Sequence, residues 1–384
     1  MTSCSIYFLE TGFFKDLPGL ESDIASSFFP FWGNYCFIDF AFTNFSEESS
    51  IKKFIILENR FKHLISLFQT KCRDKINGIF TLENGIRDLY DLIKRDDSDY
   101  ILLYVISNIS IYNSNYLLKI LNKNKSAIIK ITIDKIPLDY YLVKRKAFLK
   151  ILQSYIDRLT QEYFLKYLLF DTILHEAIEL LVDLPGIVLY QNNSMQMYMG
   201  NIWLNENINN SVFLKFLSKT YQENIEKKNS FIGESGFIKN SFISTGVEIN
   251  GYVENSILFS KVAVHKEAKI IDSVIMSNNR IGQNTIIQNS LIFPFYNDSS
   301  NIVTNIGENS IIGGKKTNVK NTIFPNQIKK GLSIIGMNSR IPGGFIMEQG
   351  TYIGPNVPYK QLKNRKILKK CSSLYINTKG NDGL

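Results

Sequence analysis

From about residue 228 onward, apolar residues recur at intervals of six. One series consists of Tyr252, Leu258, Val264, Ile270 and Met276, and an offset series consists of Ile275, Ile281, Ile287 and Phe293. A chain that turns one apolar side chain inward every six residues can wind into a triangular prism of parallel strands, in which each coil covers the one below. A β-sandwich would instead show strict alternation with irregular turn spacing. We therefore predict a left-handed parallel β-helix of hexapeptide repeats.

A second motif recurs at close to three hexads. Asn or Asp, then Ser and two apolar residues, occurs as NSFI at 240, NSIL at 255, DSVI at 272 and NSLI at 289, with spacings of 15, 17 and 17 residues. We expect the β-helix to occupy residues 226–384, with a loop excursion near 295–330, where the phase breaks.

This predicted domain ends in a basic tail. Its cationic residues are Lys360, Lys363, Arg365, Lys366, Lys369 and Lys370, and no acid occurs between Glu348 and Asp382. We expect a solvated, partly disordered end, and the alternative is a contact with an anion or a partner.

The first part of the chain, residues 1–225, alternates short apolar runs with helical patterns. The runs at 54–57 and 100–106 are rich in β-branched and aromatic residues, as in the buried strands of a parallel sheet. The spacing of apolar residues predicts helices at 60–69, 84–95 and 115–123, and one or two more within 146–182. This order predicts a Rossmann-like α/β domain.

Composition limits the class of protein. The four cysteines of the 384 residues lie far apart and form no CxxC pair, which indicates neither a zinc site nor a disulfide framework. No uncharged apolar run approaches the ~20 residues of a membrane helix, and no signal peptide is recognisable. Apart from the tail, the basic residues behind the net charge of +9 are scattered. We expect a cytoplasmic protein that binds neither nucleic acid nor a membrane.

Three stretches resemble the ADP-glucose pyrophosphorylase (glucose-1-phosphate adenylyltransferase) family. PFWGNYCFIDFAFTNFSEESSIKKFIIL (30–57) is similar to the family's P-F-G-G-x-Y-R-x-I-D-F motif and the strand after it. ENGIRDLYDLIKRDDSDYILL (83–103) is similar to its G-T-A-D-A-x-Y-x-N-L region, and GYVENSILFSKVAV (251–264) to its first β-helix coils. The resemblance implies a reduced nucleotidyltransferase domain before the β-helix.

The phosphate-binding loop of the family is degraded in this sequence. Active members begin with G-G-x-G-x-R-L and a downstream Lys or Arg, whereas here Gly12 stands alone and Asp23 falls near the place of the cation. Cys36 also replaces the Arg of Y-R-x-I-D-F. An acid beside a triphosphate repels it, so this loop is unsuited to nucleotide transfer.

The family's two metal-binding Asp residues also have no counterpart. They would align with 107–109 (Ser-Asn-Ile) and with 191–194 (Gln-Asn-Asn-Ser), and neither stretch contains an acid. The segment that carries the family's E-K-P lysine is omitted. Asp134 or Asp139 could replace that lysine, although no spacing supports this.

The resemblance therefore implies a non-catalytic regulatory subunit, closest to the GlgD-type chains that pair with a catalytic homologue in glycogen and ADP-glucose synthesis. We expect no catalytic residue, no metal ligand and no cofactor, with Mg²⁺ only if the chain is active. Expected partners are a catalytic adenylyltransferase homologue or the chain itself, in a tetramer. A sugar phosphate or nucleotide effector could bind in a remnant cleft near Gly33, Gly85 and Asn108, each of which could equally be a turn glycine or a strand-end cap.

Three other functions stay open. The chain could be an active sugar-phosphate nucleotidyltransferase with an atypical site, or a scaffold with an empty cleft. It could also be an acyltransferase, because many hexapeptide β-helices use a His to transfer an acetyl group from acetyl-CoA. His265 is the only His in the β-helix, and a surface role is the plainer interpretation.

Overall fold

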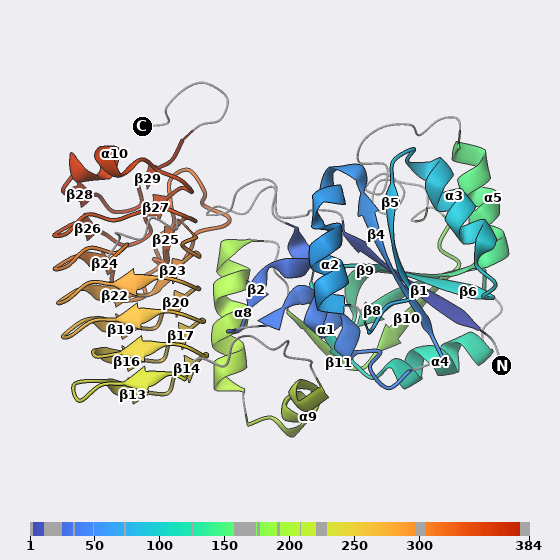
Figure 1. Ribbon diagram of the computed structural model, residues 1–384, viewed down its shortest axis with the longest axis horizontal. Coiled ribbons are helices and arrows are strands. Elements are labelled where there is room, and N and C mark those ends of the chain that lie inside the picture. Colours follow the sequence, from blue (N-terminus) through green and yellow to red (C-terminus); the bar gives the residue numbers. More distant parts are fainter. Residues whose placement is uncertain are drawn as a thin grey trace.

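Figure 1 shows the computed structural model, in which an α/β domain lies beside a β-helix. The structure describes residues 3–10, 25–33, 35–48, 50–72, 74–106, 108–123, 126–156, 174, 177–189, 193–207, 209–219, 229–296 and 304–376. Within these ranges, no helix has the length and apolar character needed to span a bilayer.

The α/β domain is built on a seven-stranded sheet with the order β10-β8-β9-β6-β1-β4-β5. The strands are β1 (Cys4–Glu10), β4 (Lys52–Glu58), β5 (Gly78–Leu82), β6 (Tyr100–Val105), β8 (Ile128–Ile133), β9 (Ile136–Lys144) and β10 (Leu180–Leu184). Neighbours pair parallel except at β9, which is antiparallel to β6 and β8. The carboxyl ends of the other six strands therefore meet at one edge, and the two strands predicted from apolar runs are β4 and β6.

Helices cover both faces of this sheet (Figure 1). The described helices of the domain are α1 (Phe37–Thr43), α2 (Ile65–Cys72), α3 (Ile86–Arg95), α4 (Ser114–Lys123), α5 (Arg145–Tyr155), α8 (Ser194–Glu206) and α9 (Ser211–Lys219), with short 3-10 turns η2 (Ser26–Phe28) and η3 (Asn59–Leu64). α3 and α5 pack on one face, and α1, α2 and α4 on the other.

The prediction of one or two helices within 146–182 is wrong at the end of this stretch. α5 ends at Tyr155, residues 157–173 lie outside the described residues, and Leu180–Leu184 is strand β10 beside β8. A short apolar run such as LLVDL does not distinguish strand from helix, and here pairing with β8 decides the outcome. Two further pairs complete the domain. They are the hairpin of β2 (Pro30–Phe31) with β3 (Tyr35–Cys36), and β7 (Ile109–Tyr112) with β11 (Gly186–Leu189).

The β-helix consists of three parallel sheets stacked as coils, and the predicted left-handed β-helix is confirmed. The first sheet contains β12 (Phe231–Ile232), β15 (Glu248–Ile249), β18 (Ala263–Val264) and β21 (Arg280–Ile281). The second contains β13 (Phe237–Lys239), β16 (Tyr252–Glu254), β19 (Lys269–Ile271), β22 (Ile286–Gln288), β24 (Ile311–Gly313), β26 (Ile346–Met347) and β28 (Ile367–Leu368). The third contains β14 (Phe242–Ile243), β17 (Ile257–Leu258), β20 (Val274–Ile275), β23 (Ser290–Ile292), β25 (Ser333–Ile335), β27 (Tyr352–Ile353) and β29 (Ser373–Leu374).

The repeated Asn/Asp-Ser motif forms the corner between the second and third sheets. Its first residue has a left-handed backbone at each turn, with φ of 45° to 47° at Asn240, Asn255, Asp272 and Asn289. Asn and Asp tolerate this conformation better than other residues that have a Cβ. The following serine hydroxyls join successive coils, since the amide of Ser273 donates to Ser256 Oγ at 3.0 Å. The motif therefore encodes a corner.

The phase break at 295–330 is not one continuous excursion, and its first part includes residues 297–303, which lie outside the described residues. Ile306 bridges Ile281, and β24 pairs with β22, so residues 306–313 lie within the prism. The second excursion joins β24 to β25. It returns at a corner where the backbone of Lys330 accepts a hydrogen bond from Asn289 Nδ2 at 3.1 Å.

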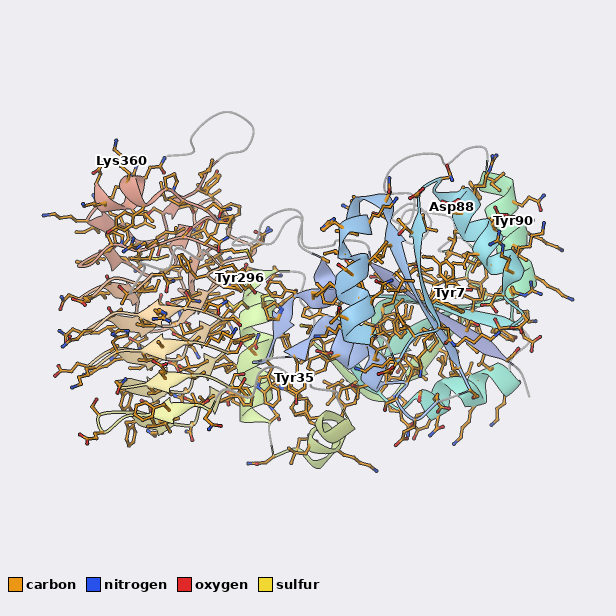
Figure 2. The ribbon with its side chains drawn as sticks, viewed as in Figure 1. Tyr7, Tyr35, Asp88, Tyr90, Tyr296 and Lys360 are labelled. Carbon is orange, nitrogen blue, oxygen red and sulfur yellow. The ribbon has the colours of Figure 1, made fainter. Side chains whose placement is uncertain are left out.

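The basic tail is folded as far as residue 376. Lys360 and Lys363 lie on α10 (Tyr359–Lys363), which caps the prism, and β28 and β29 follow (Figure 2). Residues 309–376 contain 12 Lys or Arg and one acid, Glu348, whereas the whole chain has 44 basic and 35 acidic residues. The remaining residues therefore have 32 basic and 34 acidic side chains, and the net positive charge belongs to the terminal coils.

The two domains share a hydrophobic core. Outward-facing residues of the third sheet, such as Ile257 and Val274, belong to the same buried cluster as the sheet face under α1. Trp32 stacks on Phe242 of β14 with ring centroids 4.3 Å apart. Tyr198 of α8 donates from its hydroxyl to the carbonyl of Asp272 at 2.6 Å. The β-helix is thus fixed against the α/β domain through apolar and hydrogen-bonded contacts.

Candidate functional site

The carboxyl edge of the parallel strands is the first place to look for a site, because ligands of open α/β sheets bind there. β1 ends at Glu10, β4 ends at Glu58, and Gly85 and Asn108 follow β5 and β6. Sequence reasoning singled out the last two. It missed Glu10 and Glu58. The feature that could have identified them is an acid directly at the end of a buried apolar strand.

Both of these carboxylates are held by protein donors. The backbone amide of Ser27 donates to Glu10 Oε2 at 2.8 Å, and Glu10 is fully buried. Glu58 is 5% exposed, and its Oε2 lies 2.7 Å from Arg60 Nη2. The charge of Glu58 is thus balanced by Arg60, and one oxygen of Glu10 accepts from a backbone amide.

Asp139 is the most perturbed acid near this edge. It lies on β9, next to Tyr140, which pairs with Tyr104 just before the end of β6. Burial raises the pKa of Asp139 to about 6, and Lys130 offsets part of this effect. Its carboxyl therefore changes protonation close to neutral pH. Asp134, the other acid considered from the sequence, is exposed in the turn between β8 and β9.

Asn108 is buried at the start of a segment that folds back over the sheet. The Ser110 hydroxyl of β7 lies 3.0 Å from both the Tyr104 and Tyr140 hydroxyls, and those two rings stack at 4.0 Å. Asn108 itself is 7% exposed. The resemblance aligns residues 107–109 with the metal-binding acid of the family, and of these Asn108 is a buried amide.

The two glycines lie in different parts of the domain. Gly85 has φ 61° and is the N-cap residue of α3, after β5. Gly33 has φ 83° and lies against the β-helix, where an added Cβ would be 2.6 Å from the Phe242 ring. Gly85 and Asn108 both follow strands at the carboxyl edge, but β1 and β4 lie between β6 and β5, so the two residues are not brought together, and Gly33 belongs to the contact between domains.

Several positions at which the family's motifs are missing fall outside the described ranges. These are Gly12, Asp23, Ser107, Gln191 and Asn192. Asn193 is described and caps α8, with its Oδ1 accepting from the amide of Gln196 at 2.9 Å. Across the described ranges, no group of three or more His, Cys, Asp or Glu side chains is arranged to hold a metal ion.

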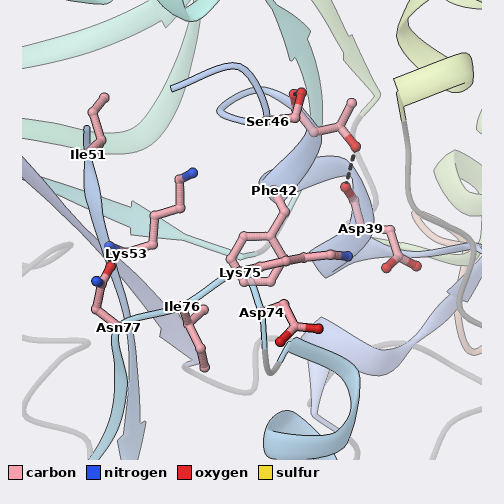
Figure 3. Close-up of a pocket in the computed structure, with 10 residues that line it drawn as sticks. Asp39, Phe42, Ser46, Ile51, Lys53, Asp74, Lys75, Ile76 and Asn77 are labelled. Atoms are coloured by element: carbon pink, nitrogen blue, oxygen red, sulfur yellow. Dashed lines mark hydrogen bonds between the residues drawn. The ribbon is translucent and has the colours of Figure 1, made fainter. Parts of the chain in front are cut away.

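Two of the cavities in the described part of the chain lie away from the carboxyl edge. One, of about 330 Å³, is on the first sheet of the β-helix and is lined in part by His265, Glu248 and Gln283. The other, of about 500 Å³, is in the α/β domain at the amino ends of β4 and β5 (Figure 3). It is lined by Asp39, Phe42, Thr43, Ser46, Ile51, Lys53, Asp74, Lys75, Ile76 and Asn77.

Comparison with known proteins gives a family model that matches part of the β-helix and relatives that match part of the chain. Residues 226–329 match the family model described as GlmU-like, C-terminal hexapeptide. The chain is 30% identical over 149 residues to glucose-1-phosphate adenylyltransferase of Acetivibrio thermocellus, covering 39% of this chain and 33% of the relative. Enzymes of the same name from Bacillus cytotoxicus and Bacillus thuringiensis are 36% identical over 76 residues and 32% over 74, each covering 20% of the relative. The matched stretches thus span a third or less of these relatives, and over them the chain is similar to glucose-1-phosphate adenylyltransferases.

Proposed function

We propose that this chain is a non-catalytic regulatory subunit of a glucose-1-phosphate adenylyltransferase type of assembly. The observation that carries the proposal is the chemistry of the carboxyl edge. By the resemblance, the neutral Asn108 falls within the stretch aligned with an acid, Glu58 is paired with Arg60, and the described residues offer no group of three acids that could hold a metal ion. Nucleotidyl transfer requires Mg²⁺ held by carboxylates, and this donor set is unsuited to it.

The proposed partners are a catalytic homologue or further copies of this chain, in a tetramer. The shared core between the domains supports this role, because a rigid β-helix fixed to the α/β domain can transmit a change from one domain to a neighbouring subunit. A sugar phosphate or nucleotide is the proposed effector.

The test is an assay of pyrophosphate release from ATP and glucose 1-phosphate with Mg²⁺. The purified chain alone should give none. A catalytic homologue from the same genome should show a changed rate or effector response when this chain is added. Release by the chain alone, abolished by EDTA, would overturn the proposal.

A second candidate, an active transferase with an atypical site, is favoured by one observation. Asp139 lies near the carboxyl edge with a pKa of about 6, which suits a group that exchanges a proton near neutral pH. If this candidate holds, Asp139→Asn should abolish the EDTA-sensitive release.

A further inference from the structure

The second sheet of the β-helix lies on a side of the prism that the described part of the α/β domain leaves open. The third sheet makes the contact with α8, through β17 and β20 (Figure 1). In the second sheet, each strand turns one residue into the prism, such as Ile287 or Ile312, and presents the residue before it outward. The outer face of this sheet is therefore a surface that a partner can reach.

The first outward position of each strand in this sheet contributes to an apolar stripe. Parallel pairing sets the seven positions side by side: Phe237, Tyr252, Lys269, Ile286, Ile311, Ile346 and Ile367. The four most exposed apolar members are between 39% and 53% exposed. Because neighbouring strands lie ~4.8 Å apart, the stripe extends over ~29 Å. A single exposed Ile is ordinary, whereas a stripe of this length is typical of an interaction surface.

One end of this face is strongly cationic. Five exposed basic residues surround the stripe at β28, the last strand of the sheet: Lys363, Arg365, Lys366, Lys369 and Lys370. Glu348, one coil earlier, is the acid beside them, and it accepts from the Lys370 amide at 2.7 Å. Two such ends placed against each other would repel.

The rest of the face carries little net charge. Glu254 on β16 accepts from Lys239 Nζ at 2.6 Å and from the Tyr252 hydroxyl at 2.7 Å. The Tyr252 ring stacks on Phe237 with centroids 5.3 Å apart. In the middle of the sheet, residues 282–289 contain no charged side chain. The face thus has an uncharged centre and an aromatic end opposite the cationic one.

The place of the stripe within each strand limits how two copies of the chain can pair on this face. A twofold axis parallel to the prism would reverse the direction of the partner's strands. The stripe would then miss the partner's stripe, and the two cationic ends would meet. A twofold axis parallel to the strands keeps the strand direction and reverses the prism, so stripe meets stripe and the cationic ends are separated. The second arrangement alone satisfies both conditions.

One register of this antiparallel arrangement also matches the charges. With the axis between β22 and β24, Ile286 of each copy faces Ile311 of the other, and β16 faces β28. Glu254 then lies opposite Lys369, because both follow the inward residue of their strands. Lys269 lies opposite Ile346, along which its methylene chain can pack. Six strands of each copy take part, at the ~10 Å spacing of facing sheets.

We propose that the second sheet is a self-association surface, on which two copies of this chain pack stripe against stripe with their prisms antiparallel. The partner that fits is a second copy, because one face supplies both the apolar stripe and the opposite charges that its twofold mate requires. That the pair forms part of a regulatory assembly rests on the proposed function, whereas the pairing itself does not.

The first experiment is sedimentation velocity of the full chain over a wide range of concentration. The unaltered chain should sediment with twice its own mass or a multiple of that. Ile311→Asp should weaken this association at least tenfold, because the twofold axis brings each substitution into the interface twice. The matched control is Ile323→Asp. Ile323 is 42% exposed, against 44% for Ile311, but lies beside Phe324, which packs on the third sheet, so this variant should associate as the unaltered chain does.

The second experiment tests the orientation without a destabilising charge. Tyr252→Cys and Ile367→Cys are prepared separately, mixed, and treated with a short bismaleimide cross-linker. Cross-links should join unlike variants when they are mixed, and each variant alone should give only the background of the unaltered chain, whose Cys36 and Cys371 are half-exposed. A parallel pair would instead cross-link like with like.

Three results would overturn the proposal. They are a chain that is monomeric at every concentration, equal effects of Ile311→Asp and Ile323→Asp, and cross-links within each variant alone. A chain that associates only with a catalytic homologue would also overturn it. These measurements do not involve pyrophosphate release, so failure here and failure of the proposed function are distinguishable.

Discussion

Asp139 allows the electrostatics of the candidate site to be tested through stability. Its pKa is about 6 in the folded protein, against an ordinary value of 3.8, because burial disfavours the charged carboxylate. A carboxyl whose pKa is raised by folding stabilises the fold while it is protonated, and this contribution is lost as the pH rises through 6. A pKa difference of about two corresponds to about 3 kcal/mol.

We therefore expect Asp139→Asn, which cannot ionise, to be more stable than the unaltered chain by up to about 3 kcal/mol at pH 8. The difference should shrink to nearly zero at pH 4. The assay is urea unfolding of both proteins at several pH values, followed by circular dichroism. Asp183→Asn is the matched control. Hydrogen bonds from the Thr132 hydroxyl and the Lys135 amide lower the pKa of Asp183, so its stabilisation is present at neutral pH and lost on acidification.

The two variants should thus change the pH dependence in opposite directions. An Asp139→Asn protein that is no more stable than the unaltered chain at pH 8 would refute the reasoning. It would mean that the carboxylate is compensated in the folded state, by Lys130 or by a cation.

Three other predictions concern the β-helix and its contact with the α/β domain. Gly33→Ala should lower the free energy of unfolding by at least about 1–2 kcal/mol, because Gly33 has a positive φ and an added Cβ would approach the Phe242 ring. It should also change the fluorescence emission of Trp32, measured in a Trp203→Phe background. Unchanged stability would contradict the described contact. Asn255→Val at a prism corner should lower the free energy of unfolding by about 1–2 kcal/mol, measured by thermal unfolding. Asn255→Gly should differ from the unaltered chain by only a few tenths of a kcal/mol, roughly, because glycine adopts the left-handed conformation freely. Equal effects of the two variants would argue against the left-handed corner. His265→Ala should leave stability and any partner response unchanged. If the unaltered chain transfers acetyl groups from acetyl-CoA and this variant does not, the surface role of His265 is wrong.

The β-helix could be predicted because its signal is local and repeated. Each hexad specifies one inward side chain, and the Asn/Asp-Ser motif marks the same corner in four successive coils. The region 295–330 was predicted as one excursion because residues 306–313 rejoin the prism only after an interruption of the six-residue repeat. The order of strands and helices in the α/β domain was likewise readable, but β9 and β10 are defined by pairing with distant strands and not by their own pattern.

The candidate site was less accessible to sequence reasoning. Gly33 was assigned to a remnant cleft by motif resemblance, yet its contacts are with Phe242, more than two hundred residues away. The cavity around Lys53 and Lys75 is assembled from α1, β4 and the turn before β5, which share no motif. Asn108 could be placed at the end of a strand, since an apolar run ending in polar residues predicts that position.

The central claim is that the carboxyl edge no longer holds the metal ion that nucleotidyl transfer requires. Its most direct test is a titration of the full chain with Mn²⁺ in the presence of ADP-glucose, monitored by the electron paramagnetic resonance signal of the free ion. We predict that the signal will be the same with and without the protein. A stoichiometric loss of the free-ion signal, reversed by Mg²⁺, would contradict the account.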